Sequence, residues 1–179
     1  MPDANVEFLV LPYDAADGNS LVDLLIRELE SGGWQVFRAA VAFVRNSGNF
    51  PELVAALKSF ASRGGEISLT FGADLFGGDA PASDYGAVEK LVSGLDGYPQ
   101  ASVNLYHEAH RTFHPKVYVF GNEEVGCALV IVGSSNWSTG GLLNNIEANL
   151  AVRLNFALPD HRKFYDDIVS YFTNYWSEA

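Results

Sequence analysis

Hydrophobic positions along this chain follow two alternating patterns. Short apolar runs of strand length alternate with longer stretches in which apolar residues return every three or four positions, as in amphipathic helices. The stretch Ser20–Leu29 has the helical spacing, follows a capping residue at Asn19 or Ser20, and ends before Gly32. The chain is therefore predicted to alternate between strands and helices.

The two patterns predict the following elements. Helices are expected at Ser20–Leu29, Phe50–Ser62, Tyr85–Leu95, Trp137–Leu143 and Pro159–Trp176. Strands are expected at Val6–Leu11, Gln35–Val44, Glu66–Phe71, Ser102–Tyr106, Lys116–Phe120, Gly126–Val132 and Glu147–Asn155. A loop is expected at Gly72–Pro81, and Lys116–Phe120 with Gly126–Val132 should form a hairpin. Such alternation predicts an α/β fold with a central, largely parallel (mixed) sheet and helices on both faces.

Length and composition indicate one domain covering residues 1–179. The chain has 179 residues, of which 48% are hydrophobic, and that is enough for a substantial core. No apolar run approaches the roughly 20 residues of a membrane span, and no membrane partner is expected. The first residues show no basic leader, so the cytoplasm is the expected location. Cys127 is the only cysteine and lies in an apolar strand pattern, which favours a packing role.

The net charge of −11 opposes a nucleic-acid partner. Proteins that bind nucleic acids usually present a basic face, because phosphate neutralisation supplies much of their affinity. The positive charge is unevenly placed, however. His110, Arg111, His114 and Lys116 lie within seven positions, and no acidic residue occurs between 109 and 122. A catalytic domain of this kind would need another domain or subunit to deliver DNA.

Candidate chemistry is concentrated in the second half of the chain. His114 and Lys116 are followed by Ser134, by Asn136 and then by Glu147. A neutral imidazole can attack phosphorus, and a carboxylate can fix the tautomer of that imidazole. An ammonium, a hydroxyl and an amide can hold the non-bridging oxygens. The set therefore suits a phosphodiester substrate, with Ser134 assisting in its binding.

This set resembles the signature of the phospholipase D superfamily, which is H-x-K, four residues, an Asp, and then G-S/G-x-N. The second part of that signature matches Gly133, Ser134 and Asn136. Small nucleases of the superfamily have a further Glu 11 residues after the Asn, where this chain has Glu147. The family Asp would fall at Gly121; several nuclease-type members lack it, so its loss argues mainly against a lipase. Most of the chain resembles members associated with restriction endonucleases and helicases.

The resemblance implies a phospholipase D-like fold, with His114 as the nucleophile, a covalent phosphohistidine, and no metal or other cofactor. In that scheme Glu147 is the partner of the His114 ring. The chain has one H-x-K motif, and one histidine cannot easily act on both sides of an in-line displacement. A homodimer would bring two copies of His114 together. One would attack, and the other would act as general acid and later activate water.

The sequence thus predicts a metal-independent phosphodiesterase, with DNA as the expected substrate and a restriction or repair endonuclease as the leading interpretation. A separate DNA-recognition or helicase subunit is an expected partner. One alternative is a hydrolase of phospholipids or small phosphodiesters. Another is a non-catalytic phospholipase D-like module that serves dimerisation or partner binding, an interpretation that the acidic charge favours.

Several residues allow a second interpretation. Asn136 could cap a helix that begins near Trp137, which is compatible with phosphate binding. The segment from His107 to His110 superficially resembles a zinc motif, but H-E-x-x-H would need histidine where the chain has Arg111. No metal site is therefore expected, and His110 and Arg111 could instead line the mouth of the site. The aromatic residues near the C-terminus have helical spacing that favours core or dimer packing: Phe164, Tyr165, Tyr171, Phe172, Tyr175 and Trp176.

Overall fold

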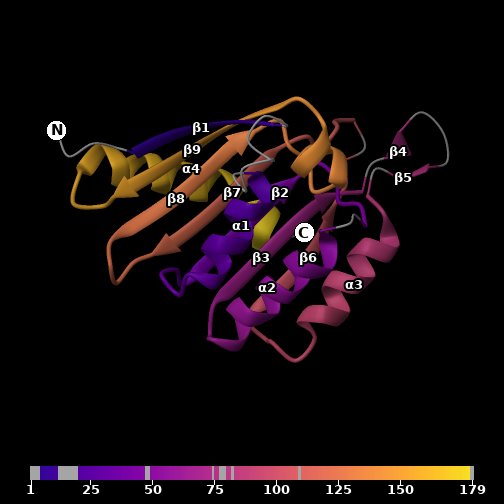
Figure 1. Ribbon diagram of the computed structural model, residues 1–179, viewed down its shortest axis with the longest axis horizontal. Helices are drawn as coiled ribbons and strands as arrows, with labels where there is room; N and C mark the ends of the chain where they lie inside the picture. Colours follow the sequence, from indigo (N-terminus) through magenta and orange to yellow (C-terminus); the bar gives the residue numbers. More distant parts are fainter. Residues whose placement is uncertain are drawn as a thin grey trace.

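A computed structural model describes residues 5–11, 20–46, 49–73, 75–76, 80–81, 83–108 and 110–177. Its centre is a seven-stranded sheet with helices on both faces (Figure 1). The strands of this sheet are β1 (Asn5–Leu11), β2 (Val36–Val41), β3 (Glu66–Gly72), β6 (Ala101–Tyr106), β7 (Lys116–Asn122), β8 (Cys127–Gly133) and β9 (Glu147–Asn155). The helices are α1 (Leu21–Glu30), α2 (Phe50–Ser62), α3 (Tyr85–Leu95) and α4 (Pro159–Ser177), with a short π-helix, η2 (Gly140–Asn144).

The strand order is β1-β9-β8-β7-β2-β3-β6. Only β2 with β3 and β3 with β6 pair in parallel, through the crossover helices α2 and α3. The other neighbours pair antiparallel, because β7, β8 and β9 follow one another as a meander and β1 joins its edge. The α/β class, the mixed sheet and the β7–β8 hairpin are confirmed. The prediction of a largely parallel sheet is wrong for the second half of the chain.

Helix α1 begins and ends where the sequence indicates. The Ser20 side chain accepts a hydrogen bond from the Asp23 N–H at 3.2 Å, and the Asp23 carboxylate accepts one from the Ser20 N–H at 3.1 Å. This reciprocal capping satisfies two backbone donors that the first helical turn leaves unpaired. Gly32, just beyond the helix, adopts a φ of 72°, which favours glycine. The alternative cap, Asn19, lies outside the described residues.

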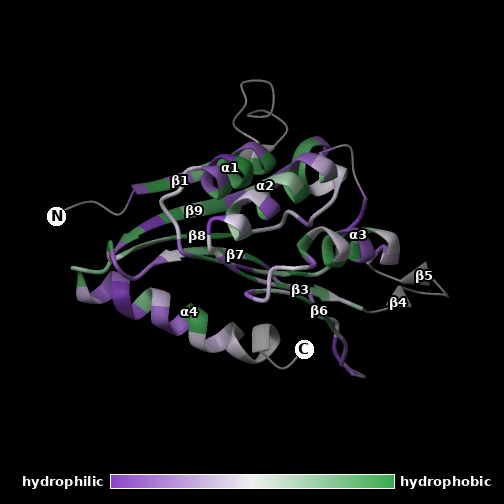
Figure 2. Cartoon of the chain, turned by 90° about the horizontal axis from the view of Figure 1, so that it is seen from below, coloured by the Kyte–Doolittle hydropathy of each residue, from purple (hydrophilic) through white to green (hydrophobic). Residues whose placement is uncertain are grey.

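Two apolar layers enclose the sheet. Helices α1, α2 and α3 cover one face, and α4 crosses the other face obliquely (Figure 2). Alternation along β7 sends Tyr118 and Phe120 into the first layer and Val117 and Val119 into the second. Tyr165 of α4 is 4% exposed and packs in the second layer. Burial on both faces explains why the central strands are nearly continuous apolar runs.

The aromatic residues of α4 divide between the core and the surface. Tyr165 is buried, as the core interpretation expects, whereas Phe164 and Tyr171 are 44% and 68% exposed. The side chains of the remaining three aromatic residues lie outside the described part. Cys127 begins β8 and is half-buried, and burial raises the pKa of its thiol. None of the helices in the described ranges has both the length and the apolar character needed to cross a membrane.

Gly121, where the H-x-K pattern would place an Asp, lies against α4. A Cβ atom at this position would come within 2.5 Å of the Tyr165 hydroxyl, so Tyr165 fills the space that a side chain would need. Gly121 is also five residues beyond Lys116 in β7, which is about 17 Å along a strand. A short acidic side chain here could not reach the His114–Lys116 pair.

Two local predictions need correction. The stretch Trp137–Leu143 was expected to be helical, but only the π-helical turn η2 forms, and it begins at Gly140. Trp137 instead bridges Val44 and is fully buried, with its ring 5.5 Å from that of Phe71. Its apolar character therefore reflects core burial rather than a helix face. The predicted loop from Gly72 to Pro81 contains a short ribbon of β4 (Leu75–Phe76) and β5 (Ala80–Pro81).

Candidate active site

The candidate residues converge on one edge of the sheet. Lys116 begins β7, Gly133 ends β8, and Glu147 begins β9. Because these three neighbouring strands alternate in direction, the start of β7, the end of β8 and the start of β9 share an edge. The sequence spacing of the motifs thus becomes spatial proximity through the hairpin and the returning strand.

The most direct contact at this edge is between Lys116 and His114. Lys116 Nζ lies 3.0 Å from His114 Nδ1 and 3.1 Å from Nε2, and it donates to the His114 carbonyl oxygen at 3.1 Å. Lys116 is only 6% exposed, whereas the His114 side chain faces solvent. His114 lies just before β7, which begins at Lys116. The pair nevertheless forms, because the buried lysine extends back under the ring.

Burial and charge both act on this pair. Burial, and secondarily the positive charge of Lys116, lower the pKa of His114. Burial also lowers the pKa of Lys116, while the negative charge of Glu147 opposes that change. Lowering the pKa of His114 keeps its ring neutral at physiological pH, the form in which a ring nitrogen can act as a nucleophile.

The Glu147 carboxylate is held by the side chains of Ser134 and Asn145. Ser134 Oγ donates to Glu147 Oε2, and Asn145 Nδ2 donates to Glu147 Oε1 at 3.2 Å. The Ala148 N–H in turn donates to Ser134 Oγ at 3.0 Å. Within the described residues the Glu147 carboxylate accepts hydrogen bonds from these two side chains, and its pairing with the His114 ring stays a prediction. Asn145 was not identified from the sequence.

A buried platform supports the Ser134 loop. Ser135 is fully buried, and its hydroxyl accepts from Asn149 Nδ2 at 2.8 Å. The Tyr118 hydroxyl donates to the Ser135 carbonyl oxygen at 3.1 Å. Burial, together with the charge of Glu147, raises the pKa of Tyr118, which keeps this hydroxyl protonated as a donor. Asn149 and Tyr118 were missed, although polar groups in otherwise apolar strands were a usable signal.

Glycines let this loop pack closely. A Cβ atom on Gly133 would lie 2.2 Å from Asn149 Oδ1 and 2.5 Å from the Ala148 carbonyl oxygen. A Cβ atom on Gly141 would lie 2.4 Å from the Asn136 carbonyl oxygen. Neither position tolerates a side chain without displacing backbone, so the two glycines allow η2 and β9 to hold the motif.

Asn136 occupies the centre of this packed loop. Its Oδ1 atom is buried and has no hydrogen-bond partner in the described part of the chain. The prediction that Asn136 caps a helix is wrong, because the cap position of η2 is Thr139. The Asn136 side chain is therefore not committed to capping, and its role as a phosphate ligand stays a prediction.

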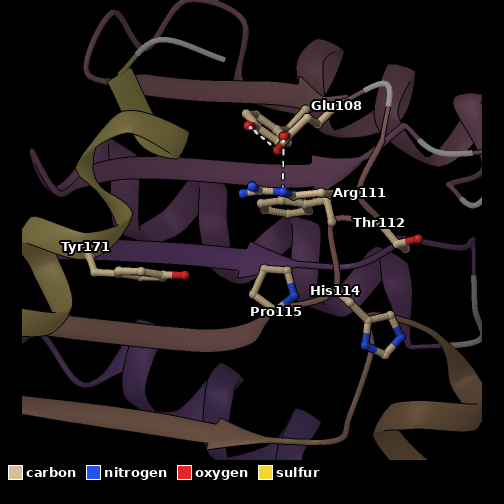
Figure 3. A pocket seen from close by; sticks show the side chains of 8 residues that line it. Glu108, Arg111, Thr112, His114, Pro115 and Tyr171 are labelled. Atoms are coloured by element: carbon tan, nitrogen blue, oxygen red, sulfur yellow. Dashed lines mark hydrogen bonds and ion pairs between the residues drawn. The ribbon is translucent and has the colours of Figure 1, made fainter.

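A cavity of about 340 Å³ opens beside His114. His114 and Pro115 form part of its wall, and Tyr171 extends toward Pro115 from α4 (Figure 3). Arg111 also lines the cavity, where its Nε lies 3.5 Å from Glu108 Oε1. A role for Arg111 at the mouth of the site stays a prediction. His110 is exposed and is not among the lining residues.

Known proteins resemble this chain both in sequence, through a family model, and in fold, through solved structures. Residues 25–176 match a family model described as the phospholipase D-like domain of cardiolipin synthase. No curated protein sequence matches the chain significantly.

Solved structures share the fold at low identity. NucT from Helicobacter pylori is 20% identical with a TM-score of 0.61, covering 94% of this chain and 97% of that one. Nuc from Salmonella typhimurium, a phospholipase D family member, is 18% identical with a TM-score of 0.61, covering 97% and 95%. A polyphosphate kinase from Porphyromonas gingivalis is 13% identical with a TM-score of 0.55, covering 90% of this chain and 25% of the kinase.

The family model spans most of the chain. The chain therefore belongs to the phospholipase D-like family of phosphodiesterases.

Proposed function

We propose that this protein is a metal-independent DNA endonuclease that works through a phosphohistidine at a site shared by two subunits. The observation that carries the proposal is the contact of the buried Lys116 ammonium with the solvent-facing ring of His114. The contact supports the proposal because a nearby cation favours the neutral form of the ring, and the pair lies at the same sheet edge as Ser134 and Glu147. Lys116 and Asn136 would hold the non-bridging oxygens, with Ser134 assisting.

The first chemical step forms a nitrogen–phosphorus bond. A ring nitrogen of His114 attacks phosphorus, and the bond between phosphorus and the leaving oxygen breaks in line. The leaving oxygen takes a proton from the partner subunit's His114. That ring gains its proton when substrate binds, because the negative charge of the phosphodiester beside it favours the protonated form. Lys116 stabilises the charge on the phosphoryl oxygens. One DNA end departs, and the other is attached to His114 as a phosphoramidate.

The second step releases that end. The partner subunit's His114 is now neutral and removes a proton from an attacking water. The water oxygen bonds to phosphorus as the nitrogen–phosphorus bond breaks, leaving a phosphate monoester and the free His114 ring. Both histidines then have their starting protonation states. The two roles lie on opposite sides of phosphorus, which is why the proposal requires two subunits.

An exposed apolar row beside the site supports dimerisation. Phe8, Leu150 and Val132 are register partners on β1, β9 and β8, and they are 66%, 43% and 43% exposed. In the sequence, Val132 is two residues from Ser134, and Leu150 is three residues from Glu147. Burying such a row against a second copy would remove apolar surface from water and bring two site edges together.

DNA is favoured as the substrate by two features. The spacing from Asn136 to Glu147 is that of the small nucleases that the chain resembles. Arg111 and Lys116 also flank His114 in a stretch of sequence that has no acidic residue, although Glu108 lies 3.5 Å from Arg111 in the structure. Because the whole chain carries a net charge of −11, affinity for DNA should be low and should fall steeply with salt.

Nicking of supercoiled plasmid in the presence of EDTA tests the proposal. We expect nicking without added metal, with no nicking by His114→Asn. Acid-labile, base-stable label on His114 after quenching would identify the phosphoramidate. Activity that appears only when Mg²⁺ or Zn²⁺ is added would overturn the mechanism. Cleavage of phospholipid vesicles but not of DNA would favour the lipid alternative, and activity on neither would favour the non-catalytic module.

A further inference from the structure

The cavity beside His114 has the size of a small-molecule site. Its volume of about 340 Å³ lies within the range typical of ligand pockets. The lining residues come from the end of β6, from the segment before β7, and from α4: Tyr106, Glu108, Arg111, Thr112, Phe113, His114, Pro115 and Tyr171. Because His114 is part of the wall, a group in this cavity would adjoin the phosphodiester.

Flat aromatic surfaces dominate the apolar part of the lining. The rings of Tyr106 and Phe113 lie 5.0 Å apart between centroids, and Phe113 is 7% exposed. Tyr171 is 68% exposed and extends across the cavity toward Pro115 (Figure 3). The exposed ring of Tyr171, beside a phosphodiester site, suits the stacking of a planar heteroaromatic ring, which is how proteins hold unpaired bases.

The polar part of the lining can read the edge of such a ring. The Glu108 carboxylate lies 3.5 Å from the Tyr106 hydroxyl and 3.5 Å from Arg111 Nε, both long contacts. The carboxylate therefore retains the capacity to accept further hydrogen bonds. A carboxylate accepts well from the exocyclic amino group of a base. The Arg111 guanidinium, 81% exposed, offers a second planar surface or a contact to phosphate.

We propose that this cavity binds one unpaired nucleobase, next to the phosphodiester that His114 attacks. The inference rests on the proposed function for the neighbouring phosphodiester, and it adds that the substrate is single-stranded or frayed at the site of cleavage. A base that is paired and stacked inside a duplex could not enter a cavity of this size. A lipid tail fits less well, because burying the charged Glu108–Arg111 pair against hydrocarbon is costly.

Two ester substrates with the same leaving group isolate the cavity. The p-nitrophenyl ester of deoxycytidine monophosphate carries a base, whereas methyl p-nitrophenyl phosphate does not. We expect wild-type protein to cleave the deoxycytidine ester with the higher kcat/KM. Tyr171→Ala should reduce the ratio of the two kcat/KM values on the order of tenfold, because it removes a stacking surface. Tyr171→Phe keeps the ring and should keep the ratio.

Phe164→Ala is the matched control, because Phe164 is an exposed aromatic residue on the same helix and lies outside the cavity. It should leave the ratio at the wild-type value. A ratio that is unchanged in Tyr171→Ala, or that falls equally in Phe164→Ala, would overturn the assignment of the base to this cavity.

Calorimetric binding tests the cavity independently of catalysis. Deoxycytidine monophosphate should bind more tightly than deoxyribose phosphate, on the order of tenfold, and Tyr171→Ala should abolish the difference. Equal binding of the two ligands would refute the cavity even if the enzyme cleaves DNA. Preferential nucleotide binding without cleavage of either ester would refute the proposed function and leave the cavity standing.

Discussion

Besides burial, the charge of Lys116 contributes to the lowered pKa of its neighbour His114. An ammonium that is 6% exposed would be costly without compensating contacts, and here it has the ring and carbonyl oxygen of His114 and the charge of Glu147. Its own charge disfavours protonation of His114. Burial first, and the charge of Lys116 second, lower the pKa of His114, so the side chain that we propose holds the phosphoryl oxygens also favours a neutral His114 ring.

This coupling predicts a measurable change when the charge is removed. Lys116→Met keeps a long apolar stem but deletes the ammonium, so the pKa of His114 should rise toward its ordinary value of 6.5. NMR titration of the His114 ring, assigned by comparison with His114→Asn, measures the shift. In wild type the neutral nucleophile persists to lower pH, so the acid limb of kcat/KM should lie below 6.5 and move upward in Lys116→Met.

The rate should fall as well. Loss of one charge-stabilising donor typically costs on the order of 10²–10³-fold in kcat. A His114 pKa that stays the same or falls in Lys116→Met would contradict the coupling, whatever happens to the rate.

At the scale of elements, three strand ends and one π-helical turn assemble the motif. The hydroxyl of Ser134 and the carboxylate of Glu147 meet because β8 and β9 are adjacent. The same contact explains why the G-S-x-N motif begins with glycine. Gly133 lies so close to the Asn149 side chain and the Ala148 carbonyl oxygen that a Cβ atom would not fit.

Gly133→Ala should therefore damage both stability and activity. The added methyl group forces backbone to move, and overpacking of this kind costs about 1–3 kcal/mol of unfolding free energy. Gly33→Ala is the matched control, because its nearest contact would be Ser31 Oγ at an ordinary 3.6 Å. Urea unfolding and plasmid nicking measure the two effects. A Gly133→Ala protein as stable and active as Gly33→Ala would show that the close approach is not required.

Local sequence patterns predicted the features that depend on residues close together in the chain. The strand and helix positions, the capping of α1, and the hairpin that joins β7 to β8 follow from spacing and turn residues. Strand direction did not follow, because an apolar run looks the same in a parallel and an antiparallel neighbour. The burial of Trp137 in the core produced a misleading helical pattern. Asn149 and Tyr118 support Ser135 from separate strands, a contact that no local window contains.

At the scale of the whole molecule, the apolar row and the single H-x-K motif lead to the same expectation of a dimer. Leu150→Lys and Phe8→Lys each place a charge within the row, on different strands. Both variants should sediment as 19 kDa monomers and lose nicking activity, whereas wild type should sediment as a dimer. Val92→Lys, at a residue 50% exposed on α3, should remain dimeric and active.

Mixed dimers separate a shared site from two independent ones. A dimer with one His114→Ala subunit lacks either the nucleophile or the general acid at every phosphate, so it should be nearly inactive. Half of the wild-type activity would mean that each subunit works alone. A wild-type protein that stays monomeric at micromolar concentration, with and without DNA, would rule out the shared site.

Gly121 and Tyr165 are 44 residues apart in the sequence but pack closely in the structure. A substitution at one position should therefore constrain which residue can occupy the other. An acidic side chain at 121 collides with the tyrosine ring, and a small residue at 165 without such a side chain leaves a hole beneath α4. Related sequences should therefore fall into two groups, one pairing glycine with an aromatic residue and one pairing an acidic residue with a smaller one. Passage between the groups should then require exchange of both residues, and an alignment of related sequences in which the two positions vary independently would contradict this expectation.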